Sequence, residues 1–267
     1  MPFWKADLHR THVSNVRILI SNDDGILARG LRILETAAAP LGELYVVAPD
    51  REQSATSHSL TLHHPLRPVQ LDTRRWQIDG TPTDCVMLAC AMLMPEHPHF
   101  VLSGINHGPN MGEDVLYSGT VAAAMEGLVL GIPSIAISFA GSVLREDSLL
   151  ETQTQALSKL LQHITTLPVF PPETLLNINL PAVAADDIKG VKLTRLGRRV
   201  FSDSVTRMKD PWGRDIVWLG GGTVNWTGPA DSDFRAVADG YISVTPLHFD
   251  LTHRDVLATA EEWWRNP

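Results

Sequence analysis

Three polar clusters along the chain contain residue types that could bind a metal ion and a phosphate group. The first is the adjacent pair Asp23 and Asp24, which follows a run of apolar, β-branched residues. Just past the end of a strand, both carboxylates can turn toward one ion. Two carboxylates balance a divalent cation and suit hard metals such as magnesium, manganese or calcium. Because Asp-Gly is common in turns, a simple Asx turn explains this motif about equally well when it is taken alone.

Two further segments supply the other groups that such a site would need. Residues 49–59 contain hydroxyls, a carboxylate and an arginine, although a polar surface loop is the simpler explanation for them. Residues 104–120 form a long glycine-punctuated segment, and such segments are seldom mere connections. This segment ends at Ser118-Gly119-Thr120, where a helix start would offer free N–H groups to a phosphate. Ser118 or Thr120 could also simply cap that helix, and the two roles are compatible.

The elements that must position these clusters alternate as strand, loop and helix. Nearly continuous apolar runs predict strands at 16–21, 44–48, 100–103 and 134–138. Such runs are typical of parallel strands that are covered on both faces. Helical periodicity or start signals predict helices at 26–38, 85–94 and 147–166. Thr81, Pro82 and Asp84 form a good start signal for the second of these helices. We expect an α/β fold with a Rossmann-like, doubly wound, mostly parallel sheet, in which ligands bind beyond the carboxyl ends of the strands.

The C-terminal part differs from the rest of the chain in composition and largely lacks helical periodicity. A stretch rich in glycine, tryptophan and charge, at about 197–239, predicts strands and hairpins that elaborate the sheet and form an arm for oligomerisation. A strand at 241–245 and a terminal helix at about 254–264 follow. Residues 1–15 precede the first strand pattern and are expected to be a loosely ordered extension. The remainder, 16–267, is expected to be a single domain.

Composition narrows the class of partner. The chain has 267 residues, a formal net charge of −8 and 44% hydrophobic residues, as in an ordinary globular protein. The negative charge disfavours binding to nucleic acid duplexes, which depends on basic residues. No apolar run of about eighteen residues predicts a membrane span, so a cytoplasmic location is expected. The absence of GxxxxGKS/T, GxGxxG and GxSxG motifs argues against P-loop NTPases, dinucleotide oxidoreductases and α/β-hydrolases.

Five motifs, in order and with matching spacing, resemble the SurE family of survival-protein nucleotidases. They are ILISNDDG at 18–25, VAPDR at 47–51 with Ser54, GTPTDC at 80–85, SGIN at 103–106 with GPN at 108–110, and YSGTVAAAMEG at 117–127. The similarity continues to the C-terminal helix and includes GYISVTPL at 240–247. The resemblance implies a Rossmann-like core and a β-rich C-terminal part used for dimer or tetramer assembly. It also implies metal-dependent hydrolysis of nucleoside 5′- and 3′-monophosphates, and of short polyphosphate in some relatives.

Matched position by position, the resemblance implies one divalent metal ion per subunit, magnesium or manganese. Its ligands would be Asp23, Asp24, Ser54 and Asn106. The phosphate would be contacted by Asn110, Ser118, Gly119 and Thr120. Catalysis would be carried by Asp23, Asp24, Asn106 and Asn110. The chain keeps all of these residues, but His107 stands where many relatives have a small residue, which would alter the rim of the pocket.

The function expected from these residues is a divalent-metal-dependent phosphomonoesterase, a 5′-nucleotidase acting on small nucleotides. Our hypothesis for the mechanism is attack of a water molecule on phosphorus, and a role for one aspartate as nucleophile or general base stays open. The alternative from another class is a non-catalytic regulatory module that binds nucleotides in the same acidic pocket. Release of phosphate distinguishes the enzyme from the binding module.

Overall fold

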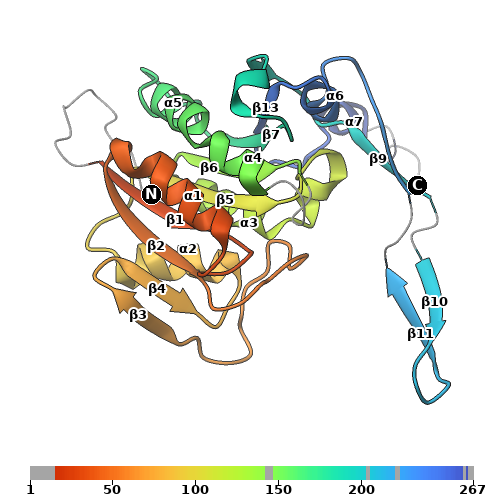
Figure 1. Cartoon of the computed structure of the whole chain (residues 1–267), viewed down its shortest axis with the longest axis horizontal. Helices are drawn as coiled ribbons and strands as arrows, with labels where there is room; N and C mark the ends of the chain where they lie inside the picture. Colours follow the sequence, from red (N-terminus) through yellow and green to blue (C-terminus); the bar gives the residue numbers. More distant parts are fainter. Residues whose placement is uncertain (1–15, 142–146, 203–204, 220–222, 261–262, 264–267) are drawn as a thin grey trace.

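A nine-stranded sheet forms the centre of the computed structural model, which describes residues 16–141, 147–202, 205–219, 223–260 and 263 (Figure 1). Its strands are β1 (Arg17–Ser21), β2 (Glu43–Pro49), β3 (Pro68–Asp72), β4 (Arg75–Ile78), β5 (Phe100–His107), β6 (Ser134–Phe139), β7 (Leu175–Leu180), β8 (Val191–Leu193) and β13 (Ile242–Leu247). They are ordered β3-β4-β2-β1-β5-β6-β7-β13-β8. The six strands from β4 to β7 in this order are parallel, whereas β3 and β13 pair antiparallel with β4 and β7. The expected α/β fold with a mostly parallel sheet is therefore confirmed.

Helices cover both faces of this sheet. They are α1 (Arg29–Ala38), α2 (Pro82–Leu88), α3 (Gly119–Val129), α4 (Asp147–Thr152), α5 (Thr154–Thr165), α6 (Asp233–Ala238) and α7 (Arg254–Ala260). One face packs against α1, α4 and α5 through a buried cluster that includes Ile20 and Leu34. The other face packs against α2 and α3 through a cluster that includes Leu19 and Val86. In the described part of the chain, no helix is long and apolar enough to cross a bilayer.

The order of the chain reverses between β1 and β5. From β1 the chain passes through α1 to β2 on one side, and β5 later pairs with the other side of β1. In doubly wound sheets, ligands bind at such a switch point, beyond the carboxyl ends of the strands. The segments that follow β1 and β5 both contain predicted site residues, so the fold places them at this point.

The third polar segment begins later than the sequence predicted. β5 continues to His107, so residues 104–107 belong to a strand and not to a loop. Glycine at position 104 permits this, because a Cβ there would lie 2.2 Å from the carbonyl oxygen of Ile137 in β6. The register with β6 shifts between Ser103 and Asn106, and a shift of this kind re-aims the end of a strand.

Two predicted helices also have different boundaries. The helix predicted at 147–166 is interrupted at Gln153, whose side-chain amide turns inward and donates to the carbonyl oxygens of Pro181 and Val183 at 2.7 and 2.6 Å. The helix predicted at 85–94 begins earlier and ends in a π-helical turn at Ala89–Leu93. Its start signal was interpreted correctly, because Thr81 and Asp84 form a capping box.

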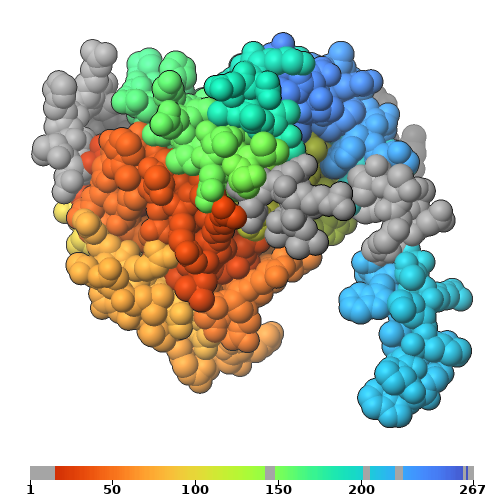
Figure 2. Space-filling view, viewed as in Figure 1, coloured from red at the N-terminus to blue at the C-terminus, as the bar shows by residue number. Residues whose placement is uncertain are grey.

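Among the described residues of the C-terminal stretch at 197–239, four strands form two antiparallel pairs. β9 (Arg198–Ser202) pairs with β12 (Thr223–Thr227), and β10 (Val205–Lys209) pairs with β11 (Asp215–Leu219). The β10–β11 hairpin extends away from the body of the molecule (Figure 1), and Figure 2 shows it as a separate projection. The β-rich elaboration expected in this part of the chain is thus present.

Helix α6 lies in the same stretch and was not predicted. The buried carboxylate of Asp233 at its first turn accepts hydrogen bonds from the backbone N–H groups of Gly112 and Gly197, at 2.8 and 2.9 Å. These bonds fix the base of the elaboration to the segment that precedes α3. The terminal helix begins at Arg254, as expected, and is described to Ala260. The extension expected at residues 1–15 lies outside the described residues.

We expect Gly30→Ala to destabilise the protein despite the better helix propensity of alanine. Gly30 lies in the first turn of α1, and a Cβ there would lie 2.0 Å from the carbonyl oxygen of Ile105 in β5. Alanine gains at most about 1 kcal/mol over glycine in a helix, whereas overpacking costs about 1–3 kcal/mol. Urea titration should therefore show a net loss in the free energy of unfolding.

Ala39→Ser is a matched control, because it also adds one heavy atom, at an exposed position directly after α1. It should change the free energy of unfolding by less than about 0.5 kcal/mol. A Gly30→Ala variant as stable as the wild type would contradict the close approach of α1 and β5.

Candidate functional site

Asp23 and Asp24 follow β1 after one residue, Asn22, at the switch point of the sheet. Asp23 is only 4% exposed and lies against the first turn of α3. Thr120 donates a hydrogen bond from its hydroxyl to the Asp23 carboxylate, and the backbone N–H groups of Gly119 and Thr120 also bind this carboxylate. Glycine at position 119 allows the contact, because a Cβ there would lie 2.7 Å from the Cβ of Asp23. The predicted metal pair and the predicted phosphate segment are therefore in contact.

The start of α3 shows one of the two roles predicted for it. The Ser118 hydroxyl accepts a hydrogen bond from the backbone N–H of Val121 at 3.0 Å, so Ser118 caps the helix. The next two residues, Gly119 and Thr120, direct their N–H groups at Asp23. Contact of Ser118, Gly119 and Thr120 with a phosphate stays a prediction.

Burial dominates the electrostatics of the two aspartates. Loss of solvent raises the pKa of Asp23, although the hydrogen bonds from Thr120 and Gly119 act in the opposite direction. Loss of solvent, followed by the charge of Asp23, raises the pKa of Asp24 to about 6. His107 opposes this rise through its charge and through its backbone N–H, 3.3 Å from Asp24 Oδ2. Two carboxylates in this condition would be stabilised by a cation.

The second polar segment packs against the aspartates. The backbone N–H of Gln53 donates to the carbonyl oxygen of Asp23 at 2.8 Å. Ser54 follows directly and is exposed, and its hydroxyl donates to Glu52 Oε1 at 2.6 Å. The charge of Glu52 in turn acts on Asp24 and raises its pKa further. The structure thus brings the segment that carries Ser54 to the metal pair, with Gln53 making the direct contact.

Two further contacts fix the far end of the second segment and were not predicted from the sequence. The backbone N–H of Ser57 donates to the carbonyl oxygen of Tyr117 at 3.2 Å. His58 Nε2 lies 2.8 Å from a carboxylate oxygen of Glu126, which is 7% exposed in α3. The segment is therefore held at both ends, by the loop that contains Asp23 and Asp24 and by α3 with the residue before its N-cap.

Asn106 lies at the end of β5, next to the residue whose N–H binds Asp24. Its side-chain nitrogen donates to the carbonyl oxygens of Gly108 and His107, at 2.8 and 3.3 Å. This orientation makes the amide oxygen the ligand atom that Asn106 would offer to a cation. Asn110 is buried, and its side-chain nitrogen donates to Ser138 Oγ at 2.8 Å.

Two asparagines of β7, Asn177 and Asn179, bind the backbone of Asn110, and the sequence analysis did not single them out. A signal for them was present in the sequence LLNINL at 175–180. Asparagine is depleted in strands, and two residues at alternate positions point to the same face. A pair of this kind in an otherwise apolar strand indicates a polar contact in the interior.

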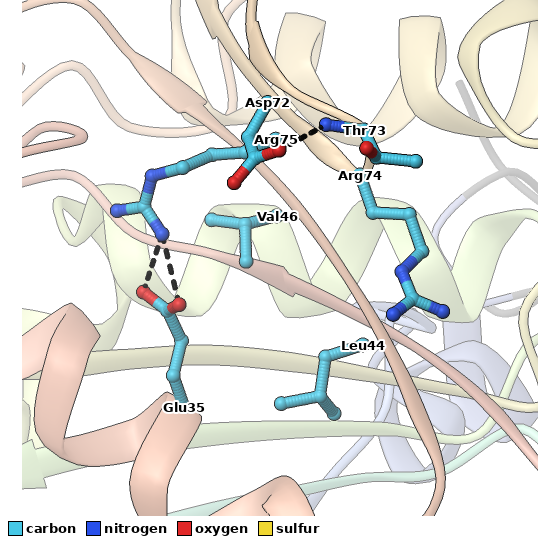
Figure 3. A pocket seen from close by; sticks show the side chains of 7 residues that line it. All are labelled: Glu35, Leu44, Val46, Asp72, Thr73, Arg74 and Arg75. Carbon is cyan, nitrogen blue, oxygen red and sulfur yellow. Dashed lines mark hydrogen bonds and ion pairs between the residues drawn. The ribbon is translucent and has the colours of Figure 1, made fainter.

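Figure 3 shows a hollow outside the site, and one of its lining residues contacts the residue directly after the loop at residues 22–25, the aspartate loop. The hollow measures about 290 Å³ and is lined by Glu35, Leu44, Val46, Asp72, Thr73, Arg74 and Arg75. Arg75 donates to both carboxylate oxygens of Glu35 in α1, at 2.8 Å each, and to the carbonyl oxygen of Ile26 at 2.9 Å. Because Ile26 directly follows the aspartate loop, Arg75 ties this loop to α1 and β4. None of the predicted site residues lines the hollow.

A cation at the aspartate pair would have two carboxylates and neutral oxygen ligands. Within the described ranges, no group of three or more histidine, cysteine, aspartate or glutamate side chains is placed to hold a metal ion. Sites rich in nitrogen or sulfur ligands, which suit zinc, are thus not found among these residues. The carboxylates of Asp23 and Asp24 have the oxygen chemistry that magnesium and manganese prefer, whereas a role for Ser54 and Asn106 as further ligands stays a prediction.

Comparison with known proteins identifies the family. Residues 18–203 match the family model described as "Survival protein SurE". The chain belongs to the SurE family. This membership confirms the resemblance that the five sequence motifs indicated.

Relatives in the SurE family match almost the whole chain. A protein from Gemmatimonas aurantiaca named 5′-nucleotidase SurE is 76% identical over 94% of this chain and 100% of its own length. Proteins of the same name from Coxiella burnetii and Geotalea uraniireducens are 45% and 43% identical, over 96% and 93% of this chain and 98% and 99% of their own lengths. The crystal structure of a SurE protein from Aquifex aeolicus superposes with a TM-score of 0.80 and 39% identity, over 92% of this chain and 99% of that chain.

We expect Asp24→Asn to stabilise the metal-free protein at about pH 7.5. The pKa of Asp24, about 6, lies above its ordinary value of 3.8, so the folded state binds a proton more tightly than the unfolded state. The contribution of Asp24 to stability therefore falls as the pH rises from about 4 through about 6. Asparagine avoids the charge and keeps an acceptor for the N–H of His107. After allowance for solvent screening, the gain should be on the order of 1–2 kcal/mol.

Urea unfolding with a chelator, at about pH 4 and about pH 7.5, measures this effect, and the gain should shrink at the lower pH because Asp24 is then protonated. Asp186→Asn, at an exposed position, is the matched control and should change stability by less than about 0.5 kcal/mol. If Asp24→Asn were less stable than the wild type at the higher pH, the electrostatic account of the pair would be wrong.

Proposed function

We propose that this chain is a nucleotidase that hydrolyses nucleoside monophosphates to nucleoside and phosphate with one divalent metal ion per subunit. The proposal includes 5′- and 3′-monophosphates and short polyphosphate. The observation that carries it is the pair of the buried Asp23 and the half-buried Asp24, with raised pKa values, of which Asp23 contacts the start of α3. Membership of the SurE family, and the name 5′-nucleotidase SurE shared by its relatives, support the nucleotidase reaction.

The metal site in this proposal consists of oxygen ligands from three segments. Asp23 and Asp24 supply the charge, and Ser54 and Asn106 supply neutral oxygens. Magnesium or manganese fits this set, since both prefer such ligands. When bound, the ion supplies positive charge that offsets the negative charge developing on the phosphate oxygens.

The chain itself would hold the phosphate with Asn110 and the start of α3. The Asn110 amide nitrogen carries two hydrogens and gives one to Ser138, which leaves the other for a phosphate oxygen. The first turn of α3 adds the positive end of a helix dipole. Donors that are fixed before the reaction stabilise developing charge without reorganising, and this effect dominates phosphoryl transfer.

The proposed partner is a small nucleotide and not a nucleic acid duplex or a membrane. The net charge of −8 supports this choice, because duplex binding depends on many basic residues. A single phosphate group needs only a local positive centre, which a metal ion and a helix N-terminus can provide. The cytoplasmic location expected from the sequence stays a prediction.

We propose further that the β10–β11 hairpin packs against another copy of the chain in a homodimer or homotetramer. Met208, Ile216 and Trp218 share one face of the hairpin. The opposite face carries the charged residues together with three apolar ones: Arg207, Lys209, Asp215, Val205, Val217 and Leu219. The side chains of Met208, Ile216 and Trp218 are exposed, at 52%, 37% and 63%. A two-stranded hairpin is marginally stable alone in water, so an apolar face of this kind favours a partner surface.

We expect the wild type to release phosphate from nucleoside 5′- and 3′-monophosphates and from short polyphosphate only when a divalent metal is present. Asp23→Asn should lose this activity. The loss in kcat/KM should be at least about a hundredfold, since even one neutral electrostatic group contributes that much. Phosphate release is measured with magnesium, manganese or chelator. Asp186→Asn, an exposed aspartate, should behave as the wild type.

Ser54→Ala keeps both carboxylates, so it should raise the metal concentration needed for half-maximal turnover and preserve most of the turnover at saturating metal. Full metal-dependent turnover by Asp23→Asn would remove this residue from the metal site. Nucleotide binding by a folded wild type without any release of phosphate would favour the regulatory binding module instead.

Replacing the apolar face of the hairpin should change the oligomeric state. We expect Met208→Ser with Trp218→Ser to yield smaller particles than the wild type in size-exclusion chromatography with light scattering. Arg207→Ser lies on the opposite face of the same strand and should leave the mass unchanged. Equal masses for the wild type and the double variant would contradict assembly through this face.

A further inference from the structure

Two asparagines near the centre of the sheet occupy positions where strand stability favours apolar residues. Asn177 and Asn179 are both 0% exposed in β7, and the other four residues of this strand are leucine or isoleucine. Being two positions apart, the asparagines share one face of the sheet. Ile178 between them belongs to the core on the opposite face. Asparagine is depleted in strands, so the two amides need another explanation.

Both amides bind the backbone of a single residue, Asn110. The Asn179 amide makes two bonds: its oxygen accepts from the backbone N–H of Asn110 at 2.9 Å, and its nitrogen donates to the Asn110 carbonyl oxygen at 3.1 Å. Asn177 donates to the same carbonyl oxygen at 2.8 Å. The side chain of Asn110 donates to Ser138 in the neighbouring strand β6. Ser138 is the register partner of Asn179, so the two residues lie side by side in the sheet. Three strand residues thus fix both the backbone and the side chain of Asn110.

The two amides satisfy the buried backbone of Asn110, which belongs to no strand of its own. Apolar residues at 177 and 179 would leave the N–H and the carbonyl oxygen of Asn110 without these partners, and each unpaired buried group costs folding free energy. The amide oxygen of Asn177 itself has no hydrogen-bond partner among the described residues. The strand thus contains two polar side chains, one of them incompletely paired, that hold a single residue in place. That residue, Asn110, is the one that the proposed function places at the phosphate.

We propose that Asn177 and Asn179 are positioning residues that hold Asn110 for contact with the substrate phosphate. This inference rests on the proposed function, in which Asn110 binds a phosphate oxygen. Asn110 lies outside regular secondary structure, in the segment between β5 and the turn at residues 112–116. Without the amide contacts this segment can shift, and a displacement of about 1 Å at a reacting group can cost on the order of a hundredfold in rate.

A double-mutant cycle on the full chain tests this role. We expect Asn179→Ala to lower kcat/KM for a nucleoside 5′-monophosphate, with saturating manganese, by about tenfold or more. In an Asn110→Ala background the same substitution should cost less than about threefold, because the residue that it positions is already absent. A merely structural role would give the same fractional loss in both backgrounds.

Ser243→Ala provides a matched control. Ser243 is buried in β13 as the register partner of Asn179, and its hydroxyl lies 2.8 Å from that of Thr194. Loss of this buried polar group should lower the melting temperature and leave kcat/KM within about twofold of the wild type. Full activity in a folded Asn179→Ala variant, or equal losses in both backgrounds, would overturn the inference.

Asn177→Ala keeps the test decisive if Asn179→Ala does not fold, because it removes one of three bonds and leaves the pairing of Asn179. It should show the same coupling to Asn110→Ala with a smaller loss. A wild type that releases no phosphate from any substrate would contradict the proposed function separately. The inference is then decided by binding of inorganic phosphate with manganese, which Asn179→Ala should weaken about tenfold, and unchanged binding would overturn it.

Discussion

Withdrawing two neighbouring carboxylates from solvent costs free energy, yet the structure holds the buried Asp23 beside the half-buried Asp24. Loss of solvation raises the pKa of both aspartates, and the charge of Asp23 raises the pKa of Asp24 further. The donors that bind Asp23 are the Thr120 hydroxyl and three backbone N–H groups, its own and those of Gly119 and Thr120, and none of them carries a full charge. They lower its pKa less than burial raises it. The pair is therefore arranged in a way that favours a bound cation, and the rest of the site depends on this electrostatic demand.

The fold brings separate segments together around the two aspartates at one edge of the sheet. β1 delivers the aspartates at the switch point, and β5 on its other side delivers Asn106. The start of α3 approaches because position 119 has no side chain. Arg75 binds the carbonyl oxygen of Ile26 from behind, so the loop is supported from a part of the molecule that contributes no site residue. Elements from several parts of the fold thus surround two neighbouring charges.

Much of this arrangement was predictable because its signals are local. Continuous apolar runs predicted the central strands, and polar residues directly after two of them predicted the site. The elements that were missed lack such signals. β3 is exposed at every position, so no buried pattern marks it. Helix α6 has only six residues, and β5 extends through a glycine whose fit depends on a neighbouring strand.

The contacts of Asn177 and Asn179 could not be predicted for a different reason. Each bond joins residues 67 or 69 positions apart in the sequence, and the partner atoms on Asn110 belong to the backbone, which every residue possesses. The sequence marks these asparagines as unusual in a strand, but only the folded sheet shows what they bind. In the proposed function, the position of the phosphate site thus depends on interior residues as well as on the loops that face the ligand.

Anomalous diffraction from crystals soaked in manganese tests the central claim most directly. The account predicts one manganese peak per subunit, within coordination distance of the carboxylates of Asp23 and Asp24, and its absence from crystals of Asp23→Asn. A peak that persists in that variant, or manganese bound only elsewhere on the molecule, would contradict the assignment of Asp23 and Asp24 as the metal site.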